Sequence, residues 1–222
     1  MLNQKSKYLQ IAFNRSLEEV REMIALLPAS EKIIIEAGTP LIKKYGQEGI
    51  MALKRWWSEK IQKEGYVVAD LKCMDRGSGE VGIAAKAGAS AATCFGLAPI
   101  ETINEFIREC EGIGIDSMVD MMNVKFPFEV LQNLKKLPSM VVLHRGVDEN
   151  ERNKEKRIPY EQIHKIKGTY NKVLISIAGG ETPRDVMRAF FNDADIVVIW
   201  RSFYESPEST AKLAQDFLKL VK

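Results

Sequence analysis

The run ADLKCMD, at residues 69–75, places three charged side chains within a short stretch of chain. In an extended strand Asp70 and Lys72 are two residues apart and point to the same face, and Asp75 follows just beyond them. A lysine between two carboxylates stays protonated, and the carboxylates stay ionised. Such a set can hold a hydrated divalent cation while the ammonium stabilises a developing oxyanion. A structural network of salt bridges at the end of a strand explains the same spacing equally well.

Two further carboxylates end apolar runs elsewhere in the chain. Glu36 follows three isoleucines, and Asp120 ends the run SMVD. Carboxylates that face one another across a cavity are unfavourable without a cation, and oxygen ligands of this kind suit Mg2+. A structural role in salt bridges remains open for both residues, as it does for the ADLKCMD run.

One of the two histidines also stands at the end of an apolar run. His144 follows MVVL and is a candidate acid or base because a histidine titrates near neutral pH. A lone histidine at a strand end is nevertheless more often structural. The other histidine, His164, lies among lysines on an expected helix, and we expect it at the surface.

Glycines and an arginine follow the last two apolar runs. Gly179 and Gly180 end the run ISIAGG, where backbone amides could approach an anion closely. Arg201, shortly after IVVIW, would complement such an anion. A tight turn alone also accounts for two adjacent glycines, and it is the simpler explanation.

The elements that must position these residues follow a regular alternation. Short β-branched runs alternate with longer amphipathic segments, and Ser16 with Glu19 forms a capping-box signature at the start of the first helix. Gly88 resembles a helix stop. Eight strand-then-helix units of about 25–30 residues follow one another, as in repeated βαβ units. The apolar runs lie at residues 9–13, 32–38, 66–72, 91–96, 116–124, 140–146, 172–180 and 195–203.

Eight continuous apolar strands imply a parallel sheet buried on both faces. An open, doubly wound sheet uses the same alternation with fewer strands. Eight units with no leftover segment therefore predict a single-domain (β/α)8 barrel over residues 1–222. In such a barrel the active site lies at the carboxyl ends of the strands, where the candidate residues would converge. The charge run at residues 149–157 is expected to be a solvated loop rather than a binding patch.

The composition excludes several classes of partner. The 32 basic and 30 acidic residues are mixed along the chain and give a net charge of +2, which argues against a nucleic-acid or membrane surface. Three cysteines with no CxxC motif suit a reducing cytosol, and we expect Cys73 to be a packing residue. We find no secretory signal and no apolar stretch of roughly 18 residues. The sequence thus predicts a cytoplasmic protein.

Taken together, these motifs resemble one enzyme family. The chain is similar to hexulose-6-phosphate synthase, to 3-keto-L-gulonate-6-phosphate decarboxylase and, more distantly, to orotidine-5'-phosphate decarboxylase. The similarity runs over nearly the whole chain and includes LQIAFN, IIIEAGTPLIK, VVADLKCMDRG, FGLAPIETI, VDMMNV, LHRGVDE, IAGG and ADIVVIWR. HRGVDE is more like the synthase, because Val147 stands where the gulonate decarboxylase has an arginine.

The resemblance implies roles for individual residues. Glu36 and Asp70 match positions at a Mg2+ site, and Lys72 matches a residue that contacts substrate oxygens. Asp75 matches an aspartate that reaches into the active site of the neighbouring subunit, which implies a homodimer. The residues that would position or protonate an enediolate are Asp120 and His144.

The implied reaction is the reversible, Mg2+-dependent addition of formaldehyde to ribulose 5-phosphate, so the partner is a sugar phosphate. The matching substrate-binding positions carry departures from the family pattern. Asn14 replaces a strand-one aspartate, Trp200 replaces a glycine just before Arg201, and Glu181 follows the glycine pair. These changes affect the positions that would bind the phosphate group and leave unchanged the residues matched to the metal site and to the enediolate.

Two alternatives to the synthase follow from these departures. One is a related enzyme with an altered phosphate site and a different substrate. The other is a barrel that has lost catalysis and serves as a binding or regulatory subunit. The presence of all the costly ionisable groups weighs against the second alternative.

Overall fold

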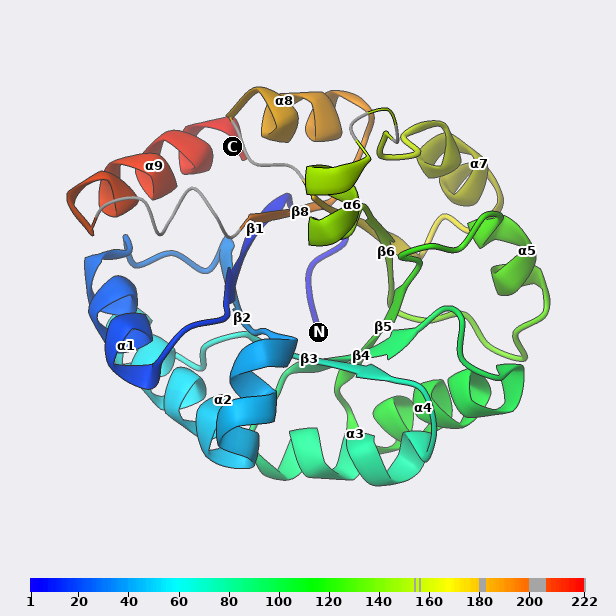
Figure 1. Cartoon of the computed structure of the whole chain (residues 1–222), viewed down its shortest axis with the longest axis horizontal. Coiled ribbons are helices and arrows are strands. Elements are labelled where there is room, and N and C mark those ends of the chain that lie inside the picture. The colour runs from blue at the N-terminus through cyan, green and yellow to red at the C-terminus, as the bar shows by residue number, and fades with distance from the viewer. Residues whose placement is uncertain (154, 156, 180–182, 200–206, 222) are drawn as a thin grey trace.

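The computed structural model describes residues 1–153, 155, 157–179, 183–199 and 207–221 (Figure 1). Its strands form one closed barrel in which every strand pairs in parallel with its neighbours in chain order, and β8 pairs with β1. The predicted (β/α)8 barrel is therefore confirmed. The strands are β1 (Tyr8–Phe13), β2 (Ile33–Ala37), β3 (Val67–Cys73), β4 (Ala91–Phe95), β5 (Asp116–Asp120), β6 (Met140–His144), β7 (Leu174–Ala178) and β8 (Ile196–Ile199).

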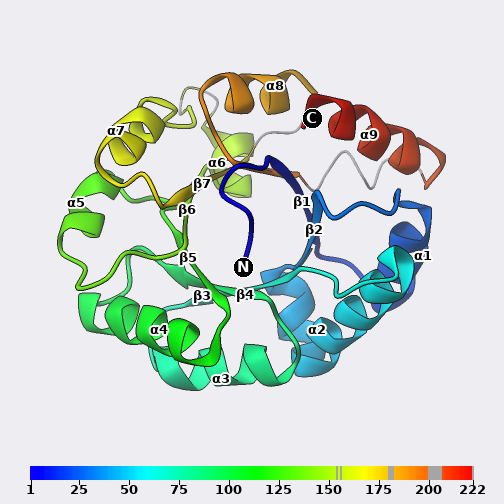
Figure 2. The same cartoon turned by 180° about the vertical axis from the view of Figure 1, so that it is seen from behind.

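The helices other than α6 surround the barrel on its outside, as Figures 1 and 2 show from its two ends. Within the described part of the chain, none of them is both long enough and apolar enough to cross a bilayer. The helices are α1 (Leu17–Leu26), α2 (Thr39–Ile61), α3 (Gly77–Lys86), α4 (Ile100–Ile113), α5 (Pro127–Gln132), α6 (Val147–Arg152), α7 (Glu161–Thr169), α8 (Pro183–Phe191) and α9 (Pro207–Leu220).

Alternation along the strands divides the buried side chains into two layers. Residues that point outward, such as Leu9 and Ile11, pack under the helices with Trp57 and Phe106. Residues that point inward fill the barrel itself and include Ile34, Val68, Met118, Met140, Leu174 and Ile196. The interior is thus a packed core, and polar side chains reach solvent only at its ends.

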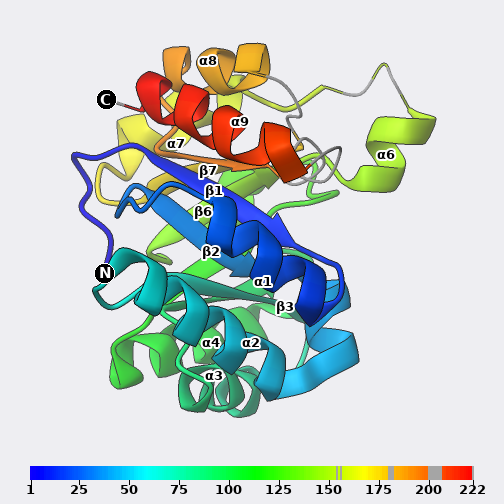
Figure 3. The ribbon, with the colours of Figure 1, turned by 90° about the vertical axis from the view of Figure 1, so that its left-hand side faces the viewer.

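The N-terminal segment closes one end of the barrel. Leu2 and Tyr66 pack against the interior core, and the Leu2 amide and the Tyr66 hydroxyl donate to Asp116 Oδ2 at 3.3 and 2.7 Å. Figure 3 shows the N-terminus at one end of the barrel and α6 at the other. The end near α6, where the strands finish, is consequently the end that can hold a site.

Local signals in the sequence set several helix boundaries. Ser16 caps α1, because its side chain accepts from the Glu19 amide while the Glu19 carboxylate accepts from the Ser16 amide. Gly88 follows the end of α3 with a φ of +85°, so the predicted helix stop is confirmed. His164 is exposed on α7, and Cys73 is buried in the outer core, as predicted.

The charge run at residues 149–157 differs from the prediction. Its first part belongs to the short helix α6 rather than to a solvated loop. The Gly146 amide donates to Glu149 Oε2 at 3.3 Å, and Asp148 and Glu149 lie in the first helical turn, where acidic side chains are favoured. These capping contacts favour a helix here, although the high charge density of the segment indicates a solvated loop.

The contact between α3 and α4 requires a glycine, and it provides a test of the packing. A Cβ added at Gly77 would lie 2.9 Å from both the Phe106 nitrogen and the Thr102 oxygen of the α4 backbone. We expect Gly77→Ala to lower the free energy of unfolding by about 1–3 kcal/mol, because the helices must separate. Denaturant-induced unfolding, followed by circular dichroism, measures this change.

Gly82, on the same helix, is the matched control. Apart from its chain neighbours and the backbone of its own helix, no atom of the described residues lies within 4 Å of a Cβ built there. Gly82→Ala should therefore raise the free energy of unfolding by about 0.5–1 kcal/mol through its helix propensity alone. Equal effects of the two substitutions would contradict the close α3–α4 contact.

Candidate active site

A cavity of about 700 Å³ opens at the carboxyl ends of the strands. This cavity contains most of the predicted site residues, whereas a second hollow does not. The other, of about 960 Å³, lies between α1 and α2 and contains none of them. The predicted residues that line the strand-end cavity are Asn14, Glu36, Asp70, Lys72, Asp120, His144 and Gly179.

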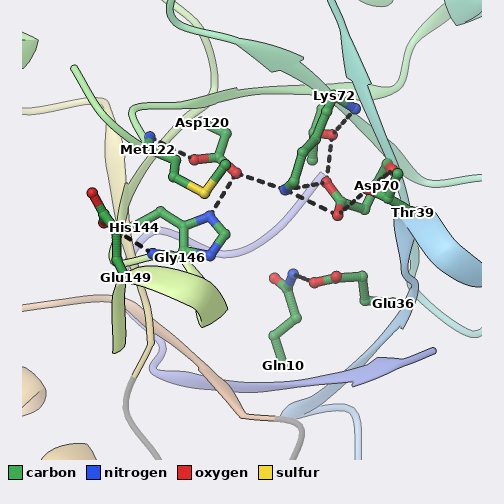
Figure 4. Close-up of polar contacts among 11 residues, drawn as sticks. Gln10, Glu36, Thr39, Asp70, Lys72, Asp120, Met122, His144, Gly146 and Glu149 are labelled. Carbon is green, nitrogen blue, oxygen red and sulfur yellow. Dashed lines mark hydrogen bonds and ion pairs between the residues drawn. The ribbon is translucent and has the colours of Figure 1, made fainter. Parts of the chain in front are cut away.

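The ammonium of Lys72 lies at the centre of the site, between two carboxylates (Figure 4). Its Nζ is 3.0 Å from Asp70 Oδ2 and 2.9 Å from Asp120 Oδ2. Burial alone would lower the pKa of Lys72, but the charges of Asp70 and Asp120 outweigh burial and raise the pKa. The lysine is therefore protonated, as predicted, although its second carboxylate is Asp120 and not Asp75.

Asp120 links this lysine to the histidine on β6. Its Oδ2 lies 2.8 Å from His144 Nδ1, and its Oδ1 accepts from the Met122 amide at 2.9 Å. Burial tends to raise the pKa of Asp120, but His144 and Lys72 hold it well below its ordinary value. In turn, burial tends to lower the pKa of His144, and Asp120 raises it. Each partner thus favours the charged form of the other, and the second ring nitrogen of His144 faces away from Asp120.

Two threonines fix the carboxylate of Asp70. Thr93 Oγ1 donates to Asp70 Oδ1 at 2.8 Å, and Thr39 Oγ1 donates to Asp70 Oδ2 at 2.8 Å. Together with Lys72 they surround both oxygens. Sequence reasoning missed both threonines. The signal for Thr93 was present, since it is a polar residue in the middle of the apolar strand AATCF.

Glu36 is the second carboxylate of the expected metal site, and it is almost wholly buried. Burial, followed by the negative charge of Asp70, raises the pKa of Glu36 to about 7. Its Oε2 accepts a short hydrogen bond from Gln10 Nε2. Gln10 Oε1 is buried in the same cavity and has no hydrogen-bond partner in the described structure. Gln10, a polar residue within LQIAF, is a third side chain that sequence reasoning missed.

These groups fit a hard divalent cation. A cation would offset the repulsion that raises the pKa of Glu36, and it would give the orphaned Gln10 oxygen a partner. The described residues contain no group of three or more His, Cys, Asp or Glu side chains placed to hold a metal. Water and substrate oxygens would therefore have to complete the coordination, which is usual for Mg2+.

The remaining predicted residues have different positions. Asp75 is exposed, and its Oδ1 accepts from the Arg76 amide at 2.8 Å. Gly179 has a φ of +105°, and a Cβ there would lie 2.6 Å from the Arg145 carbonyl oxygen, so only glycine fits. Residues outside the described part of the chain are Gly180, Glu181, Trp200 and Arg201.

Comparison with known proteins gives consistent matches. The model of the orotidine 5'-phosphate decarboxylase / HUMPS family matches residues 7–215. The chain is 39% identical over 220 residues to a bifunctional enzyme Fae/Hps of Methanothrix thermoacetophila, covering 97% of this chain and 53% of that protein. It is 40% identical over 199 residues to a protein of the same name from Archaeoglobus fulgidus, covering 88% and 48%. The chain thus spans about half the length of these curated relatives.

Solved structures show the same similarity. A 3-hexulose-6-phosphate synthase from Salmonella typhimurium superimposes with a TM-score of 0.83 at 25% identity, covering 96% of this chain and 98% of that one. Another structure of 3-hexulose-6-phosphate synthase gives a TM-score of 0.80 at 28% identity, covering 97% and 100%.

The contact between Asp120 and His144 makes a prediction about titration. In Asp120→Asn the carboxylate that raises the pKa of His144 is gone while burial remains, so we expect this pKa to fall by about 1–3 units. Nuclear magnetic resonance of the imidazole protons against pH measures it, and the exposed His164 serves as the internal reference. An unchanged His144 pKa would contradict the ion pair.

The same shift has a consequence for stability. A histidine whose pKa is raised by folding stabilises the folded state below the unfolded-state pKa of about 6.5. This contribution is lost as the pH rises through the folded-state pKa. Asp120→Asn should remove it, so the stability difference between the variant and the wild type should shrink as the pH rises.

Proposed function

The chain belongs to the orotidine 5'-phosphate decarboxylase / HUMPS family, and we propose that it is a carbon–carbon lyase of the hexulose-6-phosphate synthase type. It would add formaldehyde to ribulose 5-phosphate, reversibly. The observation that carries the proposal is the ammonium of Lys72 held between Asp70 and Asp120, beside the imidazolium of His144. The names of the relatives, Fae/Hps and 3-hexulose-6-phosphate synthase, support the choice of reaction.

The reaction has a simple balance of protons and bonds. A base takes the C1 proton of ribulose 5-phosphate, and the resulting enediolate bonds through C1 to the carbon of formaldehyde as the C=O π bond breaks. The formaldehyde oxygen then takes a proton, and the proton held by the base returns to the donor, so that no net proton is released. Lys72 would stabilise the negative charge on the enediolate oxygens. His144 would give its proton to the new alkoxide, and Asp120 would hold the neutral ring in place afterwards.

The charge of the cavity supports a requirement for Mg2+. Its described lining carries five carboxylates, against Lys72, Arg145 and His144 as the side chains that can carry positive charge. A phosphate group, with a charge of about −1.5 to −2, would be repelled by such an excess. Glu36 and Asp70, with the amide oxygen of Gln10, would hold the ion. When bound, Mg2+ would polarise the ketose carbonyl. The carboxylates that line the cavity are Glu36, Asp70, Asp120, Asp148 and Glu149.

We further propose a homodimer in which Asp75 completes the active site of the partner subunit. Asp75 is exposed and is not among the residues that line the cavity of its own chain. Three apolar side chains nearby, Met74, Leu97 and Phe126, are 47–51% exposed on the loops after β3, β4 and β5. A second copy packed on these loops would bury them.

The first test is an assay of the purified protein with Mg2+, ribulose 5-phosphate and formaldehyde, following the loss of formaldehyde. We expect activity that a chelator abolishes and Mg2+ restores. Lys72→Ala should lower kcat by at least about 100-fold, as does removal of other oxyanion-stabilising groups. His164→Ala, at the surface, should leave the activity unchanged. A folded wild-type protein without activity would reject the synthase and favour a relative with a different substrate.

Mixed dimers test the role of Asp75. Asp75→Ala and Lys72→Ala should each be nearly inactive alone. When the two variants are mixed and allowed to exchange subunits, one site of each mixed dimer regains both groups, so about a quarter of the wild-type activity should return. If Asp75 acted within its own chain, or if the protein were a monomer, mixing would restore nothing.

A further inference from the structure

The pairing of β3 with β4 is irregular at the active site. The three residues 70–72 of β3 lie opposite a single residue of β4, Thr93. The regular pairs on either side are Ala69 with Ala92 and Cys73 with Cys94. Extra residues of this kind disrupt the ladder locally and re-aim side chains, and they are frequent beside active sites.

The irregularity changes the backbone of Lys72. This residue has a φ of +47°, in the left-handed region that lysine seldom adopts. Its amide accordingly needs an acceptor other than a β4 carbonyl, and Thr93 Oγ1 accepts from it at 2.9 Å. Thr93 is 4% exposed, so water is a poor substitute for this hydroxyl.

The same hydroxyl holds the neighbouring carboxylate. Thr93 Oγ1 donates its only proton to Asp70 Oδ1 at 2.8 Å while its lone pairs remain free to accept from the Lys72 amide. One side chain thus fixes the carboxylate of Asp70 and the main chain of Lys72 together. From this backbone position the lysine side chain is long enough for its Nζ to lie 2.9 Å from Asp120 Oδ2.

We propose that Thr93 is the positioning residue of this site, because its hydroxyl closes the irregular stretch of β3 and sets where the Lys72 ammonium lies between Asp70 and Asp120. Thr93 acts by holding these residues in place, and it takes no direct part in the reaction. Thr39 provides the contrast. Its hydroxyl lies 2.8 Å from Asp70 Oδ2 and 2.9 Å from the Asp70 carbonyl oxygen, between which its one proton is shared, and in the described part of the chain it makes no hydrogen bond to Lys72.

The test compares variants of the two threonines. Thr93→Val keeps the shape and loses the hydroxyl, Thr93→Ser keeps the hydroxyl, and Thr39→Val loses a bond to Asp70 alone. Crystal structures give the φ of Lys72 and the distance from its Nζ to Asp120 Oδ2, and steady-state kinetics give kcat and KM. The kinetic readout rests on the proposed function, and the structural readout does not.

We expect Thr93→Val to move the Lys72 ammonium by about 1 Å or more and to lower kcat by about 100-fold, a typical cost of such a misplacement. Thr93→Ser should restore the geometry and stay within about threefold of wild-type kcat, since the hydrogen bonds are kept. Thr39→Val should leave the Lys72 backbone in place and cost less in kcat than Thr93→Val. If Thr93→Val does not fold, Thr93→Cys replaces it in the test. Because a thiol is a weak donor and acceptor, its kcat should be lower than that of Thr93→Ser but still measurable.

Three results would overturn the inference. The first is a valine variant that keeps Lys72 at Asp120 and keeps its kcat. The second is a serine variant as impaired as the valine or cysteine variant, and the third is an equal loss of kcat for Thr39→Val and Thr93→Val. A wild-type protein that is inactive with formaldehyde and ribulose 5-phosphate would reject the proposed function, and the displacement of Lys72 would then decide the role of Thr93 alone.

Discussion

A partly buried lysine ammonium between two carboxylates is the arrangement on which the rest of the site depends. Taking these charges out of water is costly, and removing one partner of such a buried group typically costs about 3–5 kcal/mol, because the other charge is left uncompensated. Lys72, Asp70, Asp120 and His144 must therefore be positioned together. A closed parallel barrel does this because the carboxyl ends of β3, β5 and β6 meet around one cavity. The opposite end is closed by the N-terminal segment, so the charges gather at a single opening.

Several residues of the site are held in conformations or surroundings that are unfavourable in free energy, and the packed core keeps them there. The left-handed backbone of Lys72 costs about 1–2 kcal/mol, and a buried, unpaired amide oxygen such as that of Gln10 costs about 1–3 kcal/mol. Glu36 is held in a position where burial and Asp70 raise its pKa to about 7. Each of these features is unfavourable for folding on its own. Strain and orphaned polar groups of this kind are typical of functional sites.

The sequence predicts the strands, the barrel and the strand ends that meet at the cavity. It can do so because apolar runs, and the alternation of side chains along a strand, are local properties of the chain. It could not identify contacts that depend on neighbouring strands. Asp120 takes the place expected for Asp75 beside Lys72, and this depends on the register of β3, β4 and β5. Asp70 and Lys72 face the cavity as two-residue alternation predicts, but they do so through an irregular stretch that alternation cannot reveal. Thr93 and Gln10 carried a weaker signal, as polar residues inside apolar strands.

The energetics of the cluster also bear on whether the chain is an enzyme or a binding protein. A buried ionic network is often no more stable than well-packed apolar side chains of similar volume, so stability alone does not call for one. In this protein the ionic network also has a specific geometry, which the packing of a core alone does not require. Lys72 and His144 share one carboxylate, and that carboxylate raises the pKa of both. Two fixed cationic donors at the rim of a cavity are suited to oxygens that become negative during a reaction. A site that only bound a stable sugar phosphate would gain little from them, so the arrangement favours catalysis.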